Sequence, residues 1–364
     1  MSNTQPLALY IHIPFCDAIC GYCDFTRFGY QSDLADRYLM RLHEDLKRVQ
    51  PVETIYIGGG TPTSLSLSQL EFLLESISHL IKEAKEITIE ANPDSIEADK
   101  IDLLLKYGVN RVSLGVQSTD NVMLASIGRT HSFEKVVESI SLLREKGLDN
   151  ISMDLIYGLP HQSLEDVQKD IETMLELNPV HLSLYALTIE DNSAFGRQKV
   201  KPAPNELETA MYLSIVDKLE AAGYHHYEVS NFAKKGHESL HNQHYWSYHD
   251  FYGIGIGASG KENHVRYTNT LKLNQYLQKE AQFSERIELS KEDEMFETLM
   301  MGLRSTQGVS KARFQQLFND TIDSVYYQKF QPHFDSGLLI DDGITLSATK
   351  EGRLMLHDIL VDIL

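Results

Sequence analysis

The sequence of 364 residues is poor in cysteine: it has three, and all of them, Cys16, Cys20 and Cys23, stand in one short stretch. An odd number of cysteines placed so closely does not build a disulfide framework. A chain of this length also buries enough surface on folding to be stable without covalent cross-links. The three thiols therefore indicate metal binding or catalysis rather than a structural role.

Three further features are missing. No run of about 18 apolar residues occurs, so no transmembrane helix is expected, and the first residues lack the basic and apolar regions of a signal peptide. Lysine and arginine form no clustered stripe, and the formal net charge of −19 repels phosphate backbones. These absences predict a cytoplasmic protein that binds no nucleic acid and has no integral membrane segment.

Six short segments rich in β-branched and aromatic residues alternate with amphipathic windows along the first half of the chain. This alternation predicts βαβ units with a parallel sheet, and right-handed crossovers would curl six such units into an open barrel with its helices outside. The predicted strands are Leu7–Ile13, Thr54–Ile57, Glu86–Glu90, Arg111–Val116, Ile151–Tyr157 and His181–Leu187. The predicted helices include Asp33–Val49, Leu67–Ile81, Phe133–Lys146 and Leu164–Leu175.

After Glu190 the alternation ends. The polar stretch Asn192–Asn205 predicts a connection, and Glu206–Ala222 predicts a helix that ends at Gly223. Beyond residue 290, two helices over 291–303 and 310–318, a short hairpin with Asp342-Gly343 as its turn, and a last helix predict a small winged-helix-like module. The expected domains are a barrel over residues 1–195, a connecting region over 196–288 and this module over 289–364.

The cysteine spacing, Cys16-x3-Cys20-x2-Cys23, follows the first predicted strand, on the face where barrels build their sites. Three thiolates on one short loop can each hold a different iron of a [4Fe–4S] cluster, and the fourth iron then has no protein ligand. That open iron can accept the amino and carboxylate groups of S-adenosylmethionine. Two alternatives stay open: zinc held by the three cysteines with His12, and three buried cysteines without a function.

With an aromatic residue, Tyr22, before the third cysteine, this spacing resembles the signature of the radical SAM superfamily. The longer run YIHIPFCDAICGYCDF is similar to the branch that contains oxygen-independent coproporphyrinogen III oxidases and HemW-type haem chaperones. The similarity continues through IYIGGGTPT, ITIEANPDS, RVSLGVQS, IGRTH, MDLIYGLPHQ, HNQHYW and the GLR of the C-terminal module. It implies an α/β fold, namely a radical-SAM partial (β/α)6 barrel followed by a helical, winged-helix-like module.

The resemblance also implies which residues surround S-adenosylmethionine, and several of them end successive predicted strands. The glycine run after the second strand lets a ligand approach the backbone, and by resemblance it holds the methionine amino group. Tyr22 is expected to pack against the adenine, and Glu90 to suit the ribose hydroxyls. The implied set is Tyr10, Tyr22, Gly59, Gly60, Thr61, Glu90, Gln117, Arg129, Asp154 and Thr188, beside the cluster ligands Cys16, Cys20 and Cys23.

Residues 224–252 are dense in histidine and aromatic side chains. The stretch HNQHYW resembles that of the haem chaperones. Its residue types also suit haem, because a neutral imidazole can ligate haem iron and aromatic rings offer a flat apolar surface to the porphyrin. By resemblance the haem-binding residues are His241, His244, Tyr245 and Trp246. Solvated or core histidines and a zinc site are the alternatives.

The glycine-rich segment Gly255–Gly260 matches the G-x-G-x-x-G pattern of dinucleotide sites. No clear helix follows it, and no suitable acidic residue stands about 20 residues further on, so we reject that interpretation. By resemblance, the strand near Ile254–Gly257 flanks the cofactor or substrate side of the site.

Two functions therefore compete: a haem chaperone that transfers haem to an acceptor protein, and an oxidase that decarboxylates the propionates of coproporphyrinogen III. The oxidases carry a further cysteine two residues beyond the third cluster ligand, where this chain has Phe25, and a longer segment before the cluster. The HNQHYW stretch fits the chaperones. We therefore predict a haem chaperone, with a flavodoxin or ferredoxin as the electron donor.

Overall fold

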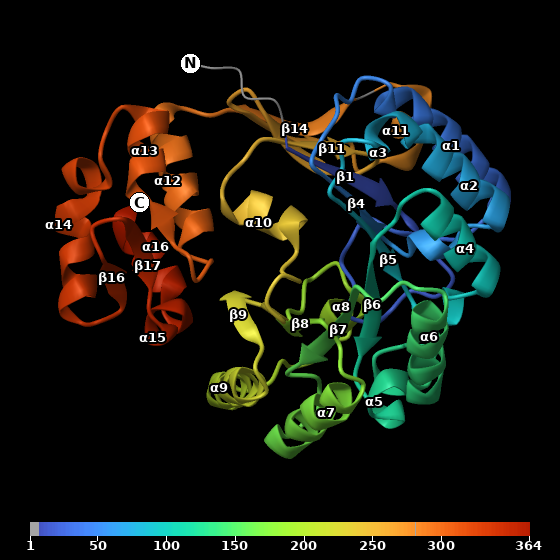
Figure 1. The fold of residues 1–364 in the computed structure, drawn as a ribbon, viewed down its shortest axis with the longest axis horizontal. Helices are drawn as coiled ribbons and strands as arrows, with labels where there is room; N and C mark the ends of the chain where they lie inside the picture. Colours follow the sequence, from blue (N-terminus) through green and yellow to red (C-terminus); the bar gives the residue numbers. More distant parts are fainter. Residues whose placement is uncertain (1–6, 281) are drawn as a thin grey trace.

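The computed structural model describes residues 7–280 and 282–364. Its main element is a twelve-stranded sheet in the order β14-β13-β12-β11-β1-β4-β5-β6-β7-β8-β10-β9. All neighbours from β11 through β1 to β8 pair in parallel, and antiparallel strands extend both edges. In Figure 1 the connecting helices follow the outer side of this curved sheet. The expected α/β fold with a parallel core is confirmed.

The six predicted core strands are all present, with ends within two residues of the predicted ones. They are β1 (Ala8–Ile13), β4 (Thr54–Gly59), β5 (Glu86–Ala91), β6 (Arg111–Gln117), β7 (Ile151–Tyr157) and β8 (His181–Ala186). Nearly every position of these strands is buried, and their apolar side chains form most of the main hydrophobic core together with the covering helices.

The helices that connect these strands cover all four predicted windows and include two further helices, over 98–106 and 121–126. They are α1 (Ser32–Leu46), α2 (Leu67–Ser76), α3 (Ser78–Ile81), α4 (Ala98–Lys106), α5 (Asn121–Ser126), α6 (Phe133–Glu145) and α7 (Leu164–Glu176). The prediction of one continuous helix over 67–81 is wrong, because α2 and α3 are separated at Ile77. The backbone of Ile77 leaves the helical region (φ −102°, ψ 1°), and its side chain is fully buried.

The region after β8 adds strands to both edges of the sheet, which the sequence does not reveal. Its elements are α8 (Ala194–Arg197), α9 (Asn205–Ala221), β9 (His225–Glu228), β10 (Asn231–Ala233), α10 (Leu240–Trp246), β11 (Phe251–Ile254), β12 (Ser259–Glu262), β13 (Val265–Asn269), α11 (Leu273–Gln278) and β14 (Phe283–Glu288). The G-x-G-x-x-G segment joins two strands and leads into no helix, which supports rejecting a dinucleotide site.

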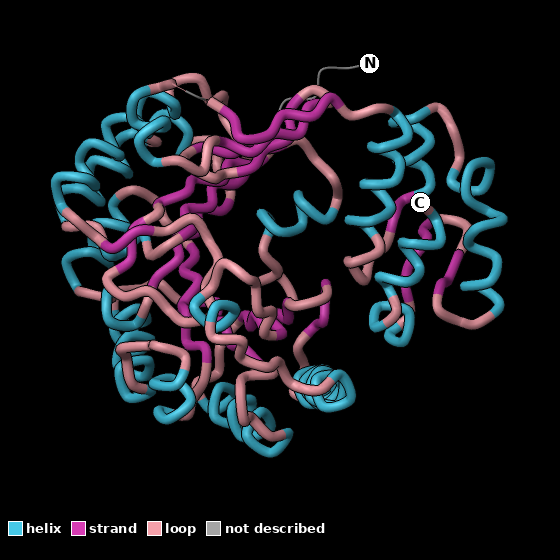
Figure 2. Tube along the Cα trace, turned by 180° about the vertical axis from the view of Figure 1, so that it is seen from behind, coloured by secondary structure: helices cyan, strands magenta, loops and turns pink. Residues whose placement is uncertain are grey.

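The C-terminal module has its own hydrophobic core, which includes Leu299, Phe314, Phe330 and Ile359. Figure 2, from behind, shows it as a separate lobe beside the barrel. Its elements are α12 (Lys291–Gly302), β15 (Val309–Ser310), α13 (Lys311–Phe318), α14 (Ile322–Asp335), β16 (Leu339–Asp341), β17 (Thr345–Ala348), α15 (Lys350–Leu354) and α16 (Leu356–Ile363). The predicted hairpin is confirmed, and Gly343 in its turn has a φ of 84°.

Two short strands, β2 (Phe15–Cys16) and β3 (Phe28–Gly29), pair in parallel and close the cysteine loop at its base. None of the helices in the described part of the chain is both long enough and apolar enough to cross a membrane.

A buried ionic network joins the sheet extension to α12. The ammonium group of Lys261 on β12 lies 2.6 Å from Asp250 Oδ1 and 3.2 Å from Glu294 Oε1 on α12. His264 Nδ1 lies 2.6 Å from the other oxygen of Glu294. Because the side chains of Lys261 and Asp250 are only 9% and 8% exposed, solvent screens their attraction little.

Replacing Lys261 with alanine should lower the free energy of unfolding by about 3–5 kcal/mol, because two buried carboxylates lose their cation. The matched control is Lys47→Ala, which removes an exposed pair with Glu44 and should change stability by less than about 0.5 kcal/mol. Denaturant unfolding of both variants measures the difference. Equal losses in the two variants would contradict a stabilising network.

Candidate functional site

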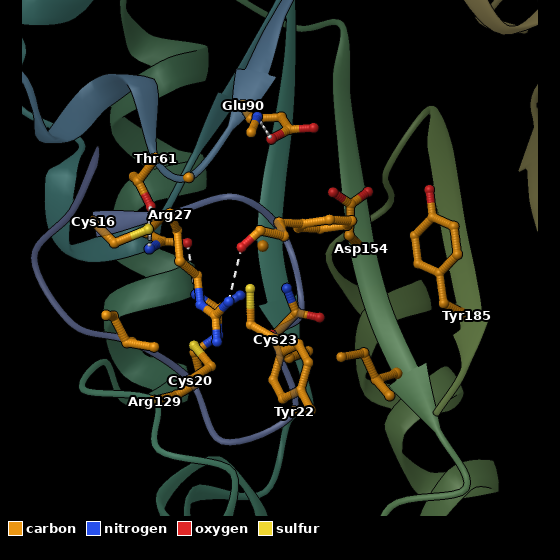
Figure 3. A pocket seen from close by; sticks show the side chains of 18 of the residues that line it. Cys16, Cys20, Tyr22, Cys23, Arg27, Thr61, Glu90, Arg129, Asp154 and Tyr185 are labelled. Carbon is orange, nitrogen blue, oxygen red and sulfur yellow. Dashed lines mark hydrogen bonds between the residues drawn. The ribbon is translucent and has the colours of Figure 1, made fainter. Parts of the chain in front are cut away.

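The parallel core brings the carboxyl ends of its strands to one edge of the sheet, and the cysteine loop lies over that edge. Cys16 ends β2 directly after β1, and the loop returns at β3, where Tyr30 N–H donates to the carbonyl of Cys16. Figure 3 shows the three cysteine side chains on one side of a cavity, with Asp154 and Tyr185 on the other. The site is therefore built by β4, β5, β6, β7 and β8 together with the cysteine loop that follows β1.

This cysteine cavity has a volume of about 350 Å³. It brings together nearly all residues that the resemblance implies for the cluster and the cofactor: Cys16, Cys20, Tyr22, Cys23, Gly59, Gly60, Thr61, Glu90, Gln117, Arg129, Asp154 and Thr188. Tyr10 is the exception, because its side chain borders a different cavity.

The glycine run at the end of β4 leaves no room for side chains. A Cβ at Gly60 would lie 2.6 Å from the carbonyl oxygen of Phe15 and 2.9 Å from Cys16 Sγ, and one at Gly58 would lie 2.8 Å from the Glu90 carboxyl group. Gly59 has a φ of 117°, which L-residues rarely adopt. These glycines let the strand end approach the cysteine loop and the cavity.

The cysteine end of the cavity brings the thiols together with two guanidinium groups. Burial raises the pKa of Cys16 to about 11 and also raises the pKa of Cys23, so both are neutral thiols until a metal displaces the proton. Arg27 and Arg129 line the same cavity. The Nε atoms of both guanidinium groups are buried, and neither has a hydrogen-bond partner in the described part of the chain.

This combination fits a [4Fe–4S] cluster with S-adenosylmethionine. Three thiols could supply the cluster ligands, and the buried Nε–H groups of Arg27 and Arg129, which have no partner among the described residues, suit a carboxylate or the negative charge of a thiolate-bound cluster. Arg129 is also held in place, because its Nη1 donates a 2.7 Å hydrogen bond to Asn92 Oδ1.

Two carboxyl groups lie at the cavity wall. Glu90 accepts hydrogen bonds from Gly59 N–H (2.9 Å) and the Tyr56 hydroxyl (2.8 Å), yet burial raises its pKa to about 7. Asp154 accepts hydrogen bonds from Ser113 (2.7 Å) and Ser152 (3.1 Å), and burial raises its pKa as well. The hydrogen-bond partners of both carboxyl groups among the described residues are neutral, which suits a ligand with hydroxyl or amino groups.

Gln117 reaches the cavity through an unusual backbone. Its φ is 70°, and the pairing of β6 with β7 shifts register between Gly115 and Gln117. Such bulges redirect a side chain beside binding sites, and a non-glycine residue with positive φ is often functional. The conformation is consistent with a role for Gln117 in ligand binding.

The zinc alternative is not supported. Both ring nitrogens of His12 are engaged, since Nε2 lies 2.7 Å from the carbonyl oxygen of Thr26 and Nδ1 lies 2.9 Å from the Tyr10 hydroxyl. Within residues 7–280 and 282–364, no three His, Cys, Asp or Glu side chains are arranged to hold a single ion.

A second cavity of about 380 Å³ lies on the other side of Tyr56. Its lining consists of uncharged and mostly aromatic residues: Tyr10, Tyr56, His241, Asn242, Tyr245, Phe251, Gly257 and Ser259. Tyr56 borders both cavities, and its ring packs against His241 at 5.2 Å between centroids. Two of the four predicted haem-binding residues, His241 and Tyr245, therefore face one cavity.

The other two predicted haem-binding residues lie outside this cavity. His244 Nε2 lies 3.6 Å from Glu53 Oε2, and its ring contacts that of His249. The indole N–H of Trp246 is buried, with no hydrogen-bond partner in the described residues.

Several residues of the cysteine cavity escape prediction from the sequence, notably Arg27, Tyr56, Asn92, Ser113 and Tyr185. Arg27 had a signal, because it is a basic residue close to the third cysteine. For Tyr56 and Ser113 the sequence gives only the alternation of side chains along a strand. This alternation does not say which cavity a side chain borders.

Comparisons with known proteins agree with this geometry. Residues 10–174 match the radical SAM superfamily, and residues 289–355 match the HemN C-terminal domain. Relatives named heme chaperone HemW from Bacillus subtilis and Lactococcus lactis are 38% and 40% identical; each alignment covers 96% of this chain, and they cover 97% and 94% of those proteins. The structure of the radical SAM enzyme coproporphyrinogen III oxidase (HemN) from Escherichia coli superposes with a TM-score of 0.87 at 25% identity, over 99% of this chain and 90% of that one.

The chain is thus a member of the radical SAM superfamily, in agreement with its parallel core and cysteine cavity. Within that superfamily it belongs to the family of the relatives named heme chaperone HemW, which it matches over nearly its full length.

The raised pKa of Glu90 predicts a pH dependence of stability. Between about pH 4.5 and 7 the folded state holds a proton that the unfolded state has lost, so stability falls as the pH rises through this range. Relative to Glu90→Gln, the free energy of unfolding of the wild-type protein should fall by about 3 kcal/mol across this pH range. Denaturant unfolding at several pH values, without added iron, measures the difference. A difference in unfolding free energy between the two proteins that does not change with pH would contradict a raised pKa of Glu90.

Proposed function

We propose that this chain is a haem chaperone of the radical SAM superfamily, which binds a [4Fe–4S] cluster, S-adenosylmethionine and haem and passes haem to an acceptor protein. The similarity to proteins named heme chaperone HemW over almost the whole of both chains carries the proposal. The three free thiols suit a reducing compartment, so we place this activity in the cytoplasm.

In this proposal Cys16, Cys20 and Cys23 are the cluster ligands. When bound, the cluster supplies an electron and S-adenosylmethionine supplies the C–S bond that this electron can cleave. Arg129, fixed by Asn92, offers its unpartnered Nε–H to a carboxylate, and Gly59 and Gly60 line the cavity without side chains, which lets a ligand approach the backbone there. Tyr22 packs with the apolar cluster around Ile127 and Phe195, which gives the cavity a flat wall for an adenine.

For haem, we propose the second cavity and α10. A neutral imidazole and several aromatic rings converge there, and no charged side chain lines the cavity. Such a lining suits the apolar face of a porphyrin. His241 is our candidate for the iron ligand, while His244, Tyr245 and Trp246 are the further residues proposed to contact haem.

The alternative function is that of an oxygen-independent coproporphyrinogen III oxidase, favoured by the superposition on the Escherichia coli enzyme. Phe25, which is 63% exposed, lines the cysteine cavity at the position where the oxidases carry a further cysteine. For that reason we rank the alternative second.

Replacing all three cysteines with serine should abolish cluster assembly, because the chain has no other thiol. Anaerobic reconstitution with iron and sulfide, followed by iron analysis and electron paramagnetic resonance of the reduced protein, measures the cluster. Undiminished cluster in the triple variant would refute the assignment of these ligands.

The wild-type protein should bind about one haem per chain, and His241→Ala should weaken that binding. Spectrophotometric haem titration measures both.

With S-adenosylmethionine, a reductant and coproporphyrinogen III under anaerobic conditions, the same preparation should form no protoporphyrinogen. Turnover in that assay would favour the oxidase, and full haem affinity in His241→Ala would remove His241 from its role.

A further inference from the structure

The imidazole of His241 is held at both of its ring nitrogens. Nδ1 lies 2.9 Å from Thr54 Oγ1 at the start of β4, and Nε2 lies 2.8 Å from the hydroxyl of Tyr245, one turn further along α10. His241 and Thr54 are 1% and 0% exposed. Tyr245, the partner of Nε2, lines the second cavity together with His241, whereas Thr54, the partner of Nδ1, is not among its lining residues.

The helix that carries His241 is fixed to the barrel. The carboxylate of Glu86 on β5 accepts hydrogen bonds from the backbone N–H groups of Leu240 and His241, both at 3.0 Å. The ring of Tyr56 packs against the imidazole. The position of His241 relative to Thr54 is therefore set by two neighbouring strands of the parallel core.

A neutral imidazole binds iron through its unprotonated nitrogen, while the other nitrogen carries the proton. Because Nδ1 faces the buried hydroxyl of Thr54, iron can reach only Nε2, and the proton then lies on Nδ1 and is donated to Thr54 Oγ1. With Nδ1 donating to Thr54, Nε2 of the neutral ring keeps a lone pair. In the structure that lone pair is engaged by the Tyr245 hydroxyl, which has no other hydrogen-bond partner in the described residues.

We propose that Thr54 and Tyr245 act on haem binding in opposite directions, an inference that rests on the proposed function. Thr54 is a positioning residue that holds the proton of His241 on Nδ1 and so orients Nε2 for iron. Tyr245 is an internal competitor whose hydroxyl occupies Nε2 until haem displaces it. On binding, the Nε2–iron bond forms and the hydrogen bond between Tyr245 and Nε2 breaks, with no transfer of electrons or protons.

The two roles predict effects of opposite sign. Partners of metal-ligating histidines typically contribute 10- to 100-fold to affinity, so Thr54→Val should weaken haem binding about tenfold. Thr54→Ser restores the hydroxyl and should restore affinity. Tyr245→Phe keeps the ring but removes the competing hydroxyl, and the worth of one hydrogen bond predicts roughly three- to tenfold tighter binding.

The chain offers a matched control. Thr88 lies on β5 opposite Tyr56, is fully buried, and its hydroxyl has no hydrogen-bond partner within the described part of the chain. Thr88→Val makes the same chemical change as Thr54→Val one strand away from His241. It should leave haem affinity unchanged.

The experiment is a haem titration of the full-length, cluster-reconstituted wild type and of the four variants, with resonance Raman spectra of the ferrous haem complexes. A hydrogen bond from Nδ1 makes the imidazole a stronger donor, so the iron–histidine stretching band should shift to lower frequency in Thr54→Val and return in Thr54→Ser. A merely structural role of Thr54 would lower affinity without moving this band.

The outcomes separate the inference from the function on which it rests. If the wild type binds no haem, the proposed function fails and the inference with it. If the wild type binds haem and Thr54→Val matches it in affinity and band position, only the inference is overturned. Weaker binding in Tyr245→Phe would overturn the competitor role, because the hydroxyl would then belong to the haem site. Circular dichroism confirms that each variant is folded before titration.

Discussion

The parallel pairing of neighbouring strands from β1 to β8 is the constraint on which the site depends. In a parallel sheet every strand ends at the same edge, so groups distant in sequence must converge there. The thiols after β1, the glycines of β4, Glu90 and Gln117 meet for this reason. Burying carboxyl and guanidinium groups at this edge costs free energy. The burial of the large apolar core between the sheet and its helices offsets that cost.

Tyr56 makes the two cavities structurally dependent on each other. Its hydroxyl donates to Glu90 in the cysteine cavity, while its ring packs against His241 and Tyr10 in the second cavity. A ligand that moves Glu90 therefore acts on the same side chain that supports the imidazole. Tyr56 lines both the cysteine cavity and the proposed haem cavity, so a displacement of its ring would alter the packing on both sides.

The parts of this architecture that could be predicted are local ones. The cysteine spacing, the strand end that carries Glu90, and the Asp342-Gly343 turn each depend on a few neighbouring residues. The pairing of β11 with β1 could not be predicted, because it joins Ala8 to Phe251 and depends on the tertiary fold. The same holds for Thr54 and His241: nothing in the pattern of β4 indicates that its first residue contacts a helix so far along the chain. Tyr10 was assigned to the cofactor by resemblance, yet it borders the second cavity, because alternation along a strand specifies a face and not the cavity behind it.

The distribution of charge separates the two candidate functions. Coproporphyrinogen III carries four propionates, and a site that decarboxylates them must hold carboxylates near the radical source with cations. The second cavity has no charged side chain among its lining residues, and the guanidinium groups of the cysteine cavity lie beside the thiols, where a bound cluster and the carboxylate of a bound cofactor would bring negative charge. An uncharged aromatic cavity suits a ligand that buries a flat apolar face and leaves its carboxylates in solvent. Haem can bind in that way as cargo, and this physical asymmetry supports the chaperone over the oxidase.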